Sequence, residues 1–258
     1  MSHSSVGFSW KEAAAFSLGG WRAFGPALVA ASVILKLAGS NSVLVFAVAA
    51  LALVPLAGSI GQSTEELAGH MGATIGGLLN AALGNITELI FGILALWAGH
   101  TEIVKASITG SIIGNLLLVF GLAAFVGGIG RERLRFSQFT SSASLSMLFL
   151  AVVALVMPAL FQFSVFGSLE ATGARIERLS LWAAAILLAS YLASLVFMLR
   201  THRSLFRVGN VLPPTIGRGA ALFALTFATV LAAIATKVLV SQLEPAIHAL
   251  GWTDLFAG

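Results

Sequence analysis

Residues 72–98 read GATIGGLLNAALGNITELIFGILALWA, a stretch long enough to cross a bilayer as one helix, because about 20 apolar residues span the hydrocarbon core. Glycines and polar residues recur in it every four positions and would share one helix face: Gly76, Asn80, Gly84, Glu88 and Gly92. Such a face suits neighbouring helices or water better than lipid. A glutamate inside a membrane is costly unless it is solvated, paired or protonated, so Glu88 indicates an ion path. The alternative is a glutamate that only holds helices together.

The composition indicates a multi-pass integral membrane protein whose main partner is the lipid bilayer. Of 258 residues, 58% are hydrophobic and only 9% are charged, whereas soluble domains carry about 25% charged residues. The chain has no cysteine, which excludes disulfides and thiolate metal sites. Its basic residues lie between the hydrophobic runs, so the net charge of +4 is better explained by membrane topology than by nucleic acid. No HExxH, phosphate loop or nucleophile elbow occurs, so we expect neither an enzyme nor a cofactor.

The hydrophobic runs predict an all-helical membrane protein with about seven transmembrane helices. The runs cover residues 23–38, 43–60, 72–98, 103–126, 139–161, 181–199 and 220–240. Residues 1–22 lack the apolar core of a signal peptide and form an amphipathic lead with Trp10, Phe16 and Trp21. Ser63 and Glu66 have capping-box spacing, which predicts the start of a new helical turn there. We therefore divide the chain into the lead (1–22), helices one to four (23–130) and helices five to seven (131–258).

The fourth run carries a polar series of its own. Ser107, Ser111 and Asn115 recur every four residues in it, so they share one helix face. A packing seam would explain the serines, but it does not require the amide of Asn115 or the carboxyl of Glu88. We expect the third and fourth helices to pack antiparallel, with Gly84, Glu88, Ser111 and Asn115 in their shared seam.

The distribution of lysine and arginine predicts the orientation. With the N-terminus in the cytoplasm, the inner segments contain Lys11, Arg22, Arg131, Arg133, Arg135, Arg200, Arg203, Arg207 and Arg218. The outer segments contain only Lys105, Arg175 and Arg178. Because cytoplasmic loops are enriched in basic residues, we expect a cytoplasmic N-terminus, in a bacterial cell membrane.

Four sequence blocks resemble a known family. Residues 84–90 (GNITELI) resemble the first α-repeat signature of the cation/proton exchanger (CAX) branch of the Ca²⁺/cation antiporter superfamily. Residues 64–68 (TEELA) resemble the segment before that repeat, and residues 76–80 (GGLLN) its opening. Residues 110–111 with 115–119 resemble its second helix. The resemblance is dense over about residues 55–130, with the repeat itself at about 72–126, and is weaker on either side.

The resemblance implies a fold and a site. In that family two inverted repeats meet at the bilayer midplane, and each contributes a glutamate that binds Ca²⁺ or a proton by turns. It implies that Glu88 is the first of these carboxylates, with Asn85, Gly84, Ser111 and Asn115 as supporting oxygens and close-packing positions. The chemistry of these residues agrees with a Ca²⁺ site, because Ca²⁺ takes six to eight oxygen ligands and these residues supply side-chain and backbone oxygens. Gly84 beside Asn85 is a place where the helix can loosen and free its carbonyls, as in broken-helix transporters.

The sequence departs from the family in two respects. A second repeat with its own signature is not found in residues 1–258, and Lys237 stands where we expect an acidic residue. We therefore expect the N-terminal portion of an exchanger, for which a second chain carrying the other repeat is a candidate partner. Two functions remain open. One is antiport of Ca²⁺ or a similar divalent cation against protons, and the other is a non-transporting membrane subunit derived from an exchanger.

Overall fold

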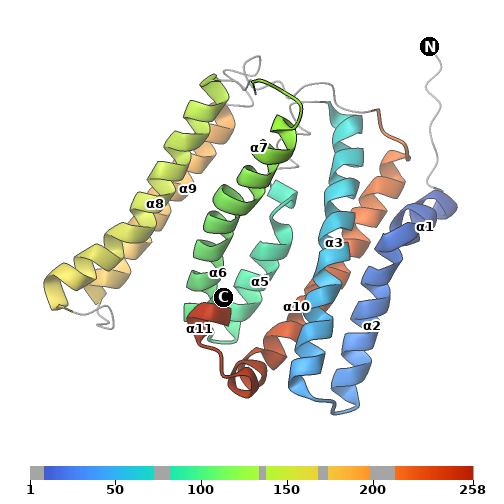
Figure 1. The fold of residues 1–258 in the computed structure, drawn as a ribbon, viewed down its shortest axis with the longest axis horizontal. Coiled ribbons are helices and arrows are strands. Elements are labelled where there is room, and N and C mark those ends of the chain that lie inside the picture. Colours follow the sequence, from blue (N-terminus) through green and yellow to red (C-terminus); the bar gives the residue numbers. More distant parts are fainter. Residues whose placement is uncertain (1–8, 73–81, 134–137, 168–173, 198–212, 258) are drawn as a thin grey trace. The chain divides into compact units, whose positions relative to one another are not determined.

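The computed structural model describes residues 9–72, 82–133, 138–167, 174–197 and 213–257, and these form helices without any strand (Figure 1). Within these described ranges, six helical segments are long and apolar enough to cross a membrane, and Ile86–Trp97 is a shorter apolar helix. The predicted all-helical membrane fold is thus confirmed. The chain forms two compact units, one of residues 132–208 and one of residues 1–131 with 209–258.

The described part of the unit of residues 132–208 contains two long helices. These are α8 (Gln138–Phe166) and α9 (Ala174–Val196), which pack against each other. The apolar windows of both helices are unburied within the structure. Large apolar side chains such as Phe149, Leu160 and Trp182 are exposed, as is expected of helices whose outer faces contact lipid.

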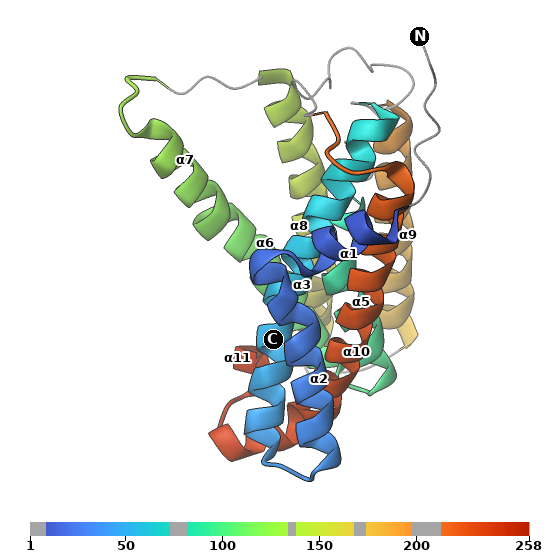
Figure 2. The ribbon, with the colours of Figure 1, turned by 90° about the vertical axis from the view of Figure 1, so that its right-hand side faces the viewer.

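The other unit is built around a pair of long helices, α3 (Ser42–Met71) and α10 (Arg218–Leu250). They lie side by side, and α2 (Phe24–Leu37) packs along both of them (Figure 2). Small side chains fill much of the contact, and the buried alanines include Ala52 of α3 and Ala221, Ala228 and Ala232 of α10. Small residues let membrane helices approach closely and gain van der Waals contact.

The N-terminal segment packs on this helix pair. It consists of α1 (Trp10–Leu18) and a short 3₁₀ turn, η1 (Gly20–Ala23). The guanidinium of Arg22 lies 4.3 Å from the centre of the Phe16 ring, a cation–π contact. Gly58 of α3 leaves the space that the Trp21 indole occupies, since a Cβ there would overlap the ring.

The other helices that the structure describes in this unit are shorter. They are α5 (Ile86–Trp97), α6 (Thr101–Gly114), the π-helical turn η2 (Asn115–Val119), α7 (Phe120–Gly128) and α11 (Asp254–Ala257). Together α6, η2 and α7 make one candidate span from Thr101 to Gly128. Helix α5 packs against α10, and α11 packs against α6.

The predicted helix start near Ser63 is wrong. Helix α3 continues unbroken from Ser42 to Met71, and Ser63 is completely buried within it. A capping box stabilises a helix start because the first backbone N–H groups lack partners there. Inside a continuous helix those groups are already bonded to carbonyls one turn earlier, so the same residue types act differently.

Glu66 instead binds the segment that leads into α10. Its carboxylate accepts hydrogen bonds from the backbone N–H of Thr215 (2.7 Å), the Thr215 hydroxyl (2.5 Å) and the backbone N–H of Ile216 (3.2 Å). One turn later, His70 Nε2 lies 2.8 Å from the carbonyl oxygen of Ile216 and donates to it. Helix α10 begins just beyond, after Gly217. These bonds fasten the end of α3 to the start of α10.

Substitution of Glu66 by alanine is expected to lower the free energy of unfolding by about 2 kcal/mol, because hydrogen bonds to a charged group contribute more than neutral ones. Thermal unfolding in detergent measures this loss, and faster amide exchange at Thr215 and Ile216 locates it. The matched control is Glu65→Ala, which removes the exposed neighbouring carboxylate. Equal effects of the two substitutions would contradict the assignment.

Candidate functional site

The stretch that was predicted as one helix over residues 72–98 is broken. Its described part is helical at Ala82 and Leu83, turns at Gly84 and Asn85, and resumes as α5 at Ile86. Asn85 has non-helical dihedral angles of φ −103° and ψ 11°. The predicted loosening next to Gly84 is therefore confirmed, whereas Gly76 and Asn80 lie outside the described residues. Such a break frees backbone N–H and C=O groups from the helical pattern.

Glu88 lies in the first turn of α5 and faces α6. The hydroxyl of Ser111 donates to Glu88 Oε1 at 2.9 Å, and the amide Nδ2 of Asn115 donates to Ser111 Oγ at 3.4 Å. The two helices form a hairpin around residues 98–100, which brings the two polar series together. The first turn of a helix also favours negative charge, because the helix dipole is positive there. The structure thus joins Glu88, Ser111 and Asn115 in one hydrogen-bonded chain.

These side chains line a cavity of about 270 Å³ between α5 and α6. Its polar lining consists of Asn85, Glu88, Ser107, Ser111 and Asn115, and its other lining residues are Phe91, Gly92, Val104, Ile108 and Ile112. Gly84 is not part of the lining and lies in the turn beside Asn85. Ser107 was absent from the predicted set of site residues, although its four-residue spacing from Ser111 was a usable signal. Phe91 and Val104 carried no such signal.

Among the described residues that line this cavity, Glu88 is the only carboxylate. Within the described parts of the chain, no three histidine, aspartate or glutamate side chains gather in a cluster that could hold a metal ion. The remaining polar groups are neutral amides and hydroxyls. Lys237 is exposed on α10 and is not among the lining residues. The cavity therefore offers one negative charge surrounded by neutral oxygens.

A π-helical turn begins at Asn115. The backbone N–H of Phe120 bonds to the carbonyl of Asn115, five residues earlier. A π turn inserts an extra residue into a helix and is frequent at functional sites. It changes the face that residues after Asn115 present. The polar series on α6 also ends at this point, because the next residues are apolar. Leu116, Leu117 and Leu118, which follow, are exposed and apolar.

A broken membrane helix, a carboxylate that faces the neighbouring helix and a polar partner helix are features of ion transporters. Residues 41–200 match the family described as sodium/calcium exchanger protein, and the chain belongs to this family. Its relatives indicate the cation/proton exchanger branch. The chain is 39% identical over 239 residues to the Ca²⁺/H⁺ antiporter of Synechocystis sp., a match that covers 85% of this chain and 63% of the relative.

Two further relatives also indicate the cation/proton exchanger branch. The vacuolar cation/proton exchanger 1a of Oryza sativa subsp. japonica is 38% identical, with 84% of this chain and 51% of the relative covered. The Ca²⁺/H⁺ antiporter ChaA of Bacillus subtilis is 37% identical, with 90% of this chain and 67% of the relative covered. Among solved structures, native YfkE superimposes with a TM-score of 0.73 at 34% identity, over 92% of this chain and 65% of that chain. The chain spans about two thirds or less of the length of these relatives.

Proposed function

We propose that this chain forms the first-repeat part of an antiporter that exchanges Ca²⁺ or a related divalent cation for protons. The observation that carries the proposal is the chain of hydrogen bonds from Glu88 through Ser111 to Asn115, beside the break at Gly84 and Asn85. The names of the relatives support antiport over a non-transporting subunit, since they are Ca²⁺/H⁺ antiporters and cation/proton exchangers.

The chemistry of exchange follows from the single carboxylate. A divalent cation binds the ionised Glu88, while Asn85, Ser111 and Asn115 supply neutral oxygens of the kind Ca²⁺ prefers. Ser111 now directs its proton at Glu88, and rotation of that hydroxyl presents its lone pairs to a cation. When the cation leaves, a proton on Glu88 removes the cost of an uncompensated charge inside the membrane. Cation and proton therefore compete for the same oxygen atoms.

The remaining ligands come from outside this cavity. Ca²⁺ takes six to eight oxygens, which is more than the polar residues of the cavity provide. A second repeat, on the same polypeptide or on a second chain, supplies the opposite side of the site and its second carboxylate. The excess of basic residues in the inner segments supports a cytoplasmic N-terminus, and we place the protein in a bacterial cell membrane.

Measuring Ca²⁺ uptake into vesicles tests the proposed function. Residues 1–258 are joined to the part of Bacillus subtilis ChaA that the chain does not match, and the chimera is placed in vesicles with an acidic interior. We expect Ca²⁺ uptake that stops when a protonophore collapses the pH gradient, because each entering cation is exchanged for protons. Uptake that persists without the gradient would contradict proton coupling.

A further inference from the structure

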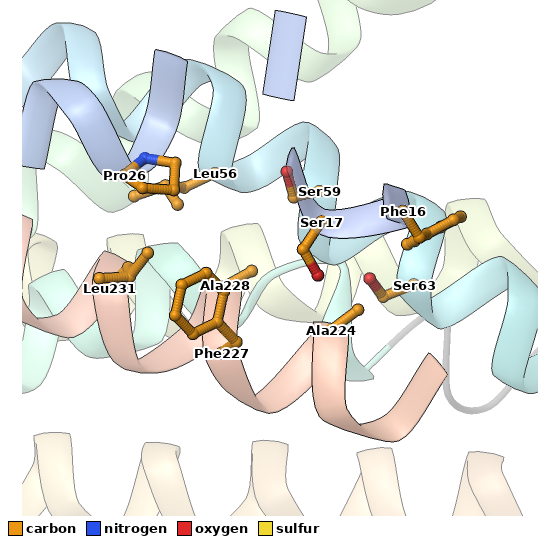
Figure 3. A pocket seen from close by; sticks show the side chains of 10 residues that line it. All are labelled: Phe16, Ser17, Pro26, Leu56, Ser59, Ser63, Ala224, Phe227, Ala228 and Leu231. Atoms are coloured by element: carbon orange, nitrogen blue, oxygen red, sulfur yellow. The ribbon is translucent and has the colours of Figure 1, made fainter. Parts of the chain in front are cut away.

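A second, much smaller cavity lies between α1, α2, α3 and α10. Its volume is about 10 Å³, and Figure 3 shows the side chains that surround it. The hydroxyls in its lining come from Ser17 of α1 and from Ser59 and Ser63 of α3. The rest of the lining is apolar and includes Leu56 and Phe227. The cavity is separate from the one that Glu88 lines.

Two of the three hydroxyls lack a hydrogen-bond partner among the described residues. Ser63 is completely buried and Ser17 is 8% exposed, and the Oγ atoms of both are unpaired. Ser59, in contrast, donates to the carbonyl of Pro55 at 2.8 Å. A buried hydroxyl without a partner costs free energy, and bonding to a carbonyl one turn earlier is the usual remedy in a helix. Ser17 and Ser63 do not use that remedy here.

We propose that this cavity binds one water molecule, which bridges the hydroxyls of Ser17 and Ser63. Buried waters occupy polar cavities that offer about two to four hydrogen-bond partners, and one water needs about 10–15 Å³ of accessible space. The cavity has that size and at least two free partners. It is too small for a hydrated ion, and without a carboxylate in its lining it offers no charge to a bare cation.

The bridge has a structural role. The side of the cavity formed by α10 presents Ala224 and Phe227, which have no polar side-chain atoms. Among the lining side chains, only those of α1 and α3 offer polar atoms to the water. The water then supplies the polar contact through which Ser17 attaches the N-terminal helix to Ser63.

A double-mutant cycle on the full chain tests the bridge, with Ser17→Ala, Ser63→Ala and the double variant compared by Tm in detergent. If one water joins both hydroxyls, each single substitution lowers Tm, and the double variant loses clearly less than the sum. In a dry cavity each substitution removes an unpaired polar group, so Tm stays constant or rises and the changes add. The second result would overturn the proposal.

The control pair is Ser32→Ala with Ser63→Ala. Ser32 is also buried, but it donates to the carbonyl of Val29 and does not line the cavity. The Tm change caused by Ser32→Ala should therefore add to the Tm change caused by Ser63→Ala. A structure of the unmutated chain that resolves waters gives an independent measurement. A density peak within hydrogen-bond distance of both hydroxyls is expected, and a Ser63 hydroxyl turned onto the Ser59 carbonyl, without such a peak, would overturn the proposal.

Discussion

An exchanger that contains these residues with Glu88→Gln is expected to lose divalent transport completely while still inserting into the membrane. Glutamine keeps the volume of the side chain but removes its charge, so the proposed main cation ligand and the proposed proton carrier disappear together. Glu88 is also the only carboxylate among the described residues that line the cavity, so none of their other side chains can replace it. Ca²⁺ uptake into proton-loaded vesicles measures the loss, and uptake at the unmutated rate would contradict the assignment of Glu88.

Two further substitutions are compared with Glu88→Gln in the same transport measurement. Asn115→Ala removes a proposed neutral ligand and a hydrogen bond to Ser111. Such a hydrogen bond is worth on the order of 1 kcal/mol in membranes, so transport should fall only several-fold. Glu102→Gln is the control. It removes an exposed carboxylate at the start of α6 that pairs with Lys105 at 2.7 Å, and exposed pairs contribute little. Transport should remain close to the unmutated rate.

Purified residues 1–258 on their own are expected to show no Ca²⁺ flux above that of empty vesicles under an imposed pH gradient. Alternating access in such transporters needs two repeats that move about a shared site. The cavity described here supplies one carboxylate and a few neutral oxygens. Transferring a divalent cation from water into such a partial site is strongly unfavourable, since most of its hydration would not be replaced.

Self-association could complete the site only if two copies inserted in opposite orientations. The bias of basic residues toward one side of the membrane opposes such an arrangement. Robust flux from residues 1–258 alone that disappears with Glu88→Gln would therefore contradict this prediction. It would show instead that a half-size transporter works by itself.

The sequence predicted the elements that depend on local pattern. Hydrophobic runs located the helices, because membrane helices must be apolar over a fixed length. The four-residue spacing of Ser111 and Asn115 predicted that both face the same neighbour, and the structure joins them to Glu88. Gly84 beside Asn85 predicted the break, because glycine costs a helix free energy.

Features that depend on distant partners could not be predicted. The spacing of Ser63 and Glu66 fits a helix start, but Glu66 bonds to Thr215, which lies 149 residues away in the chain. Nothing in the local sequence identifies that partner. The π turn at Asn115 likewise has no sequence pattern of its own. Ser17 and Ser63 line one cavity only because α1 packs against α10, the neighbour of α3.

The alanine-rich contact between α3 and α10 has a consequence for how the stability of this helix pair depends on temperature. Alanine has no rotamers to lose, so ordering this contact costs no side-chain entropy. Lipid tails are as apolar as the contact itself, and the helices are held by van der Waals contact rather than by release of water. Cooling weakens the hydrophobic effect but has little effect on such a contact. The contact that Ala221, Ala228 and Ala232 make with α3 should therefore stabilise the helix pair about as much at low temperature as at room temperature.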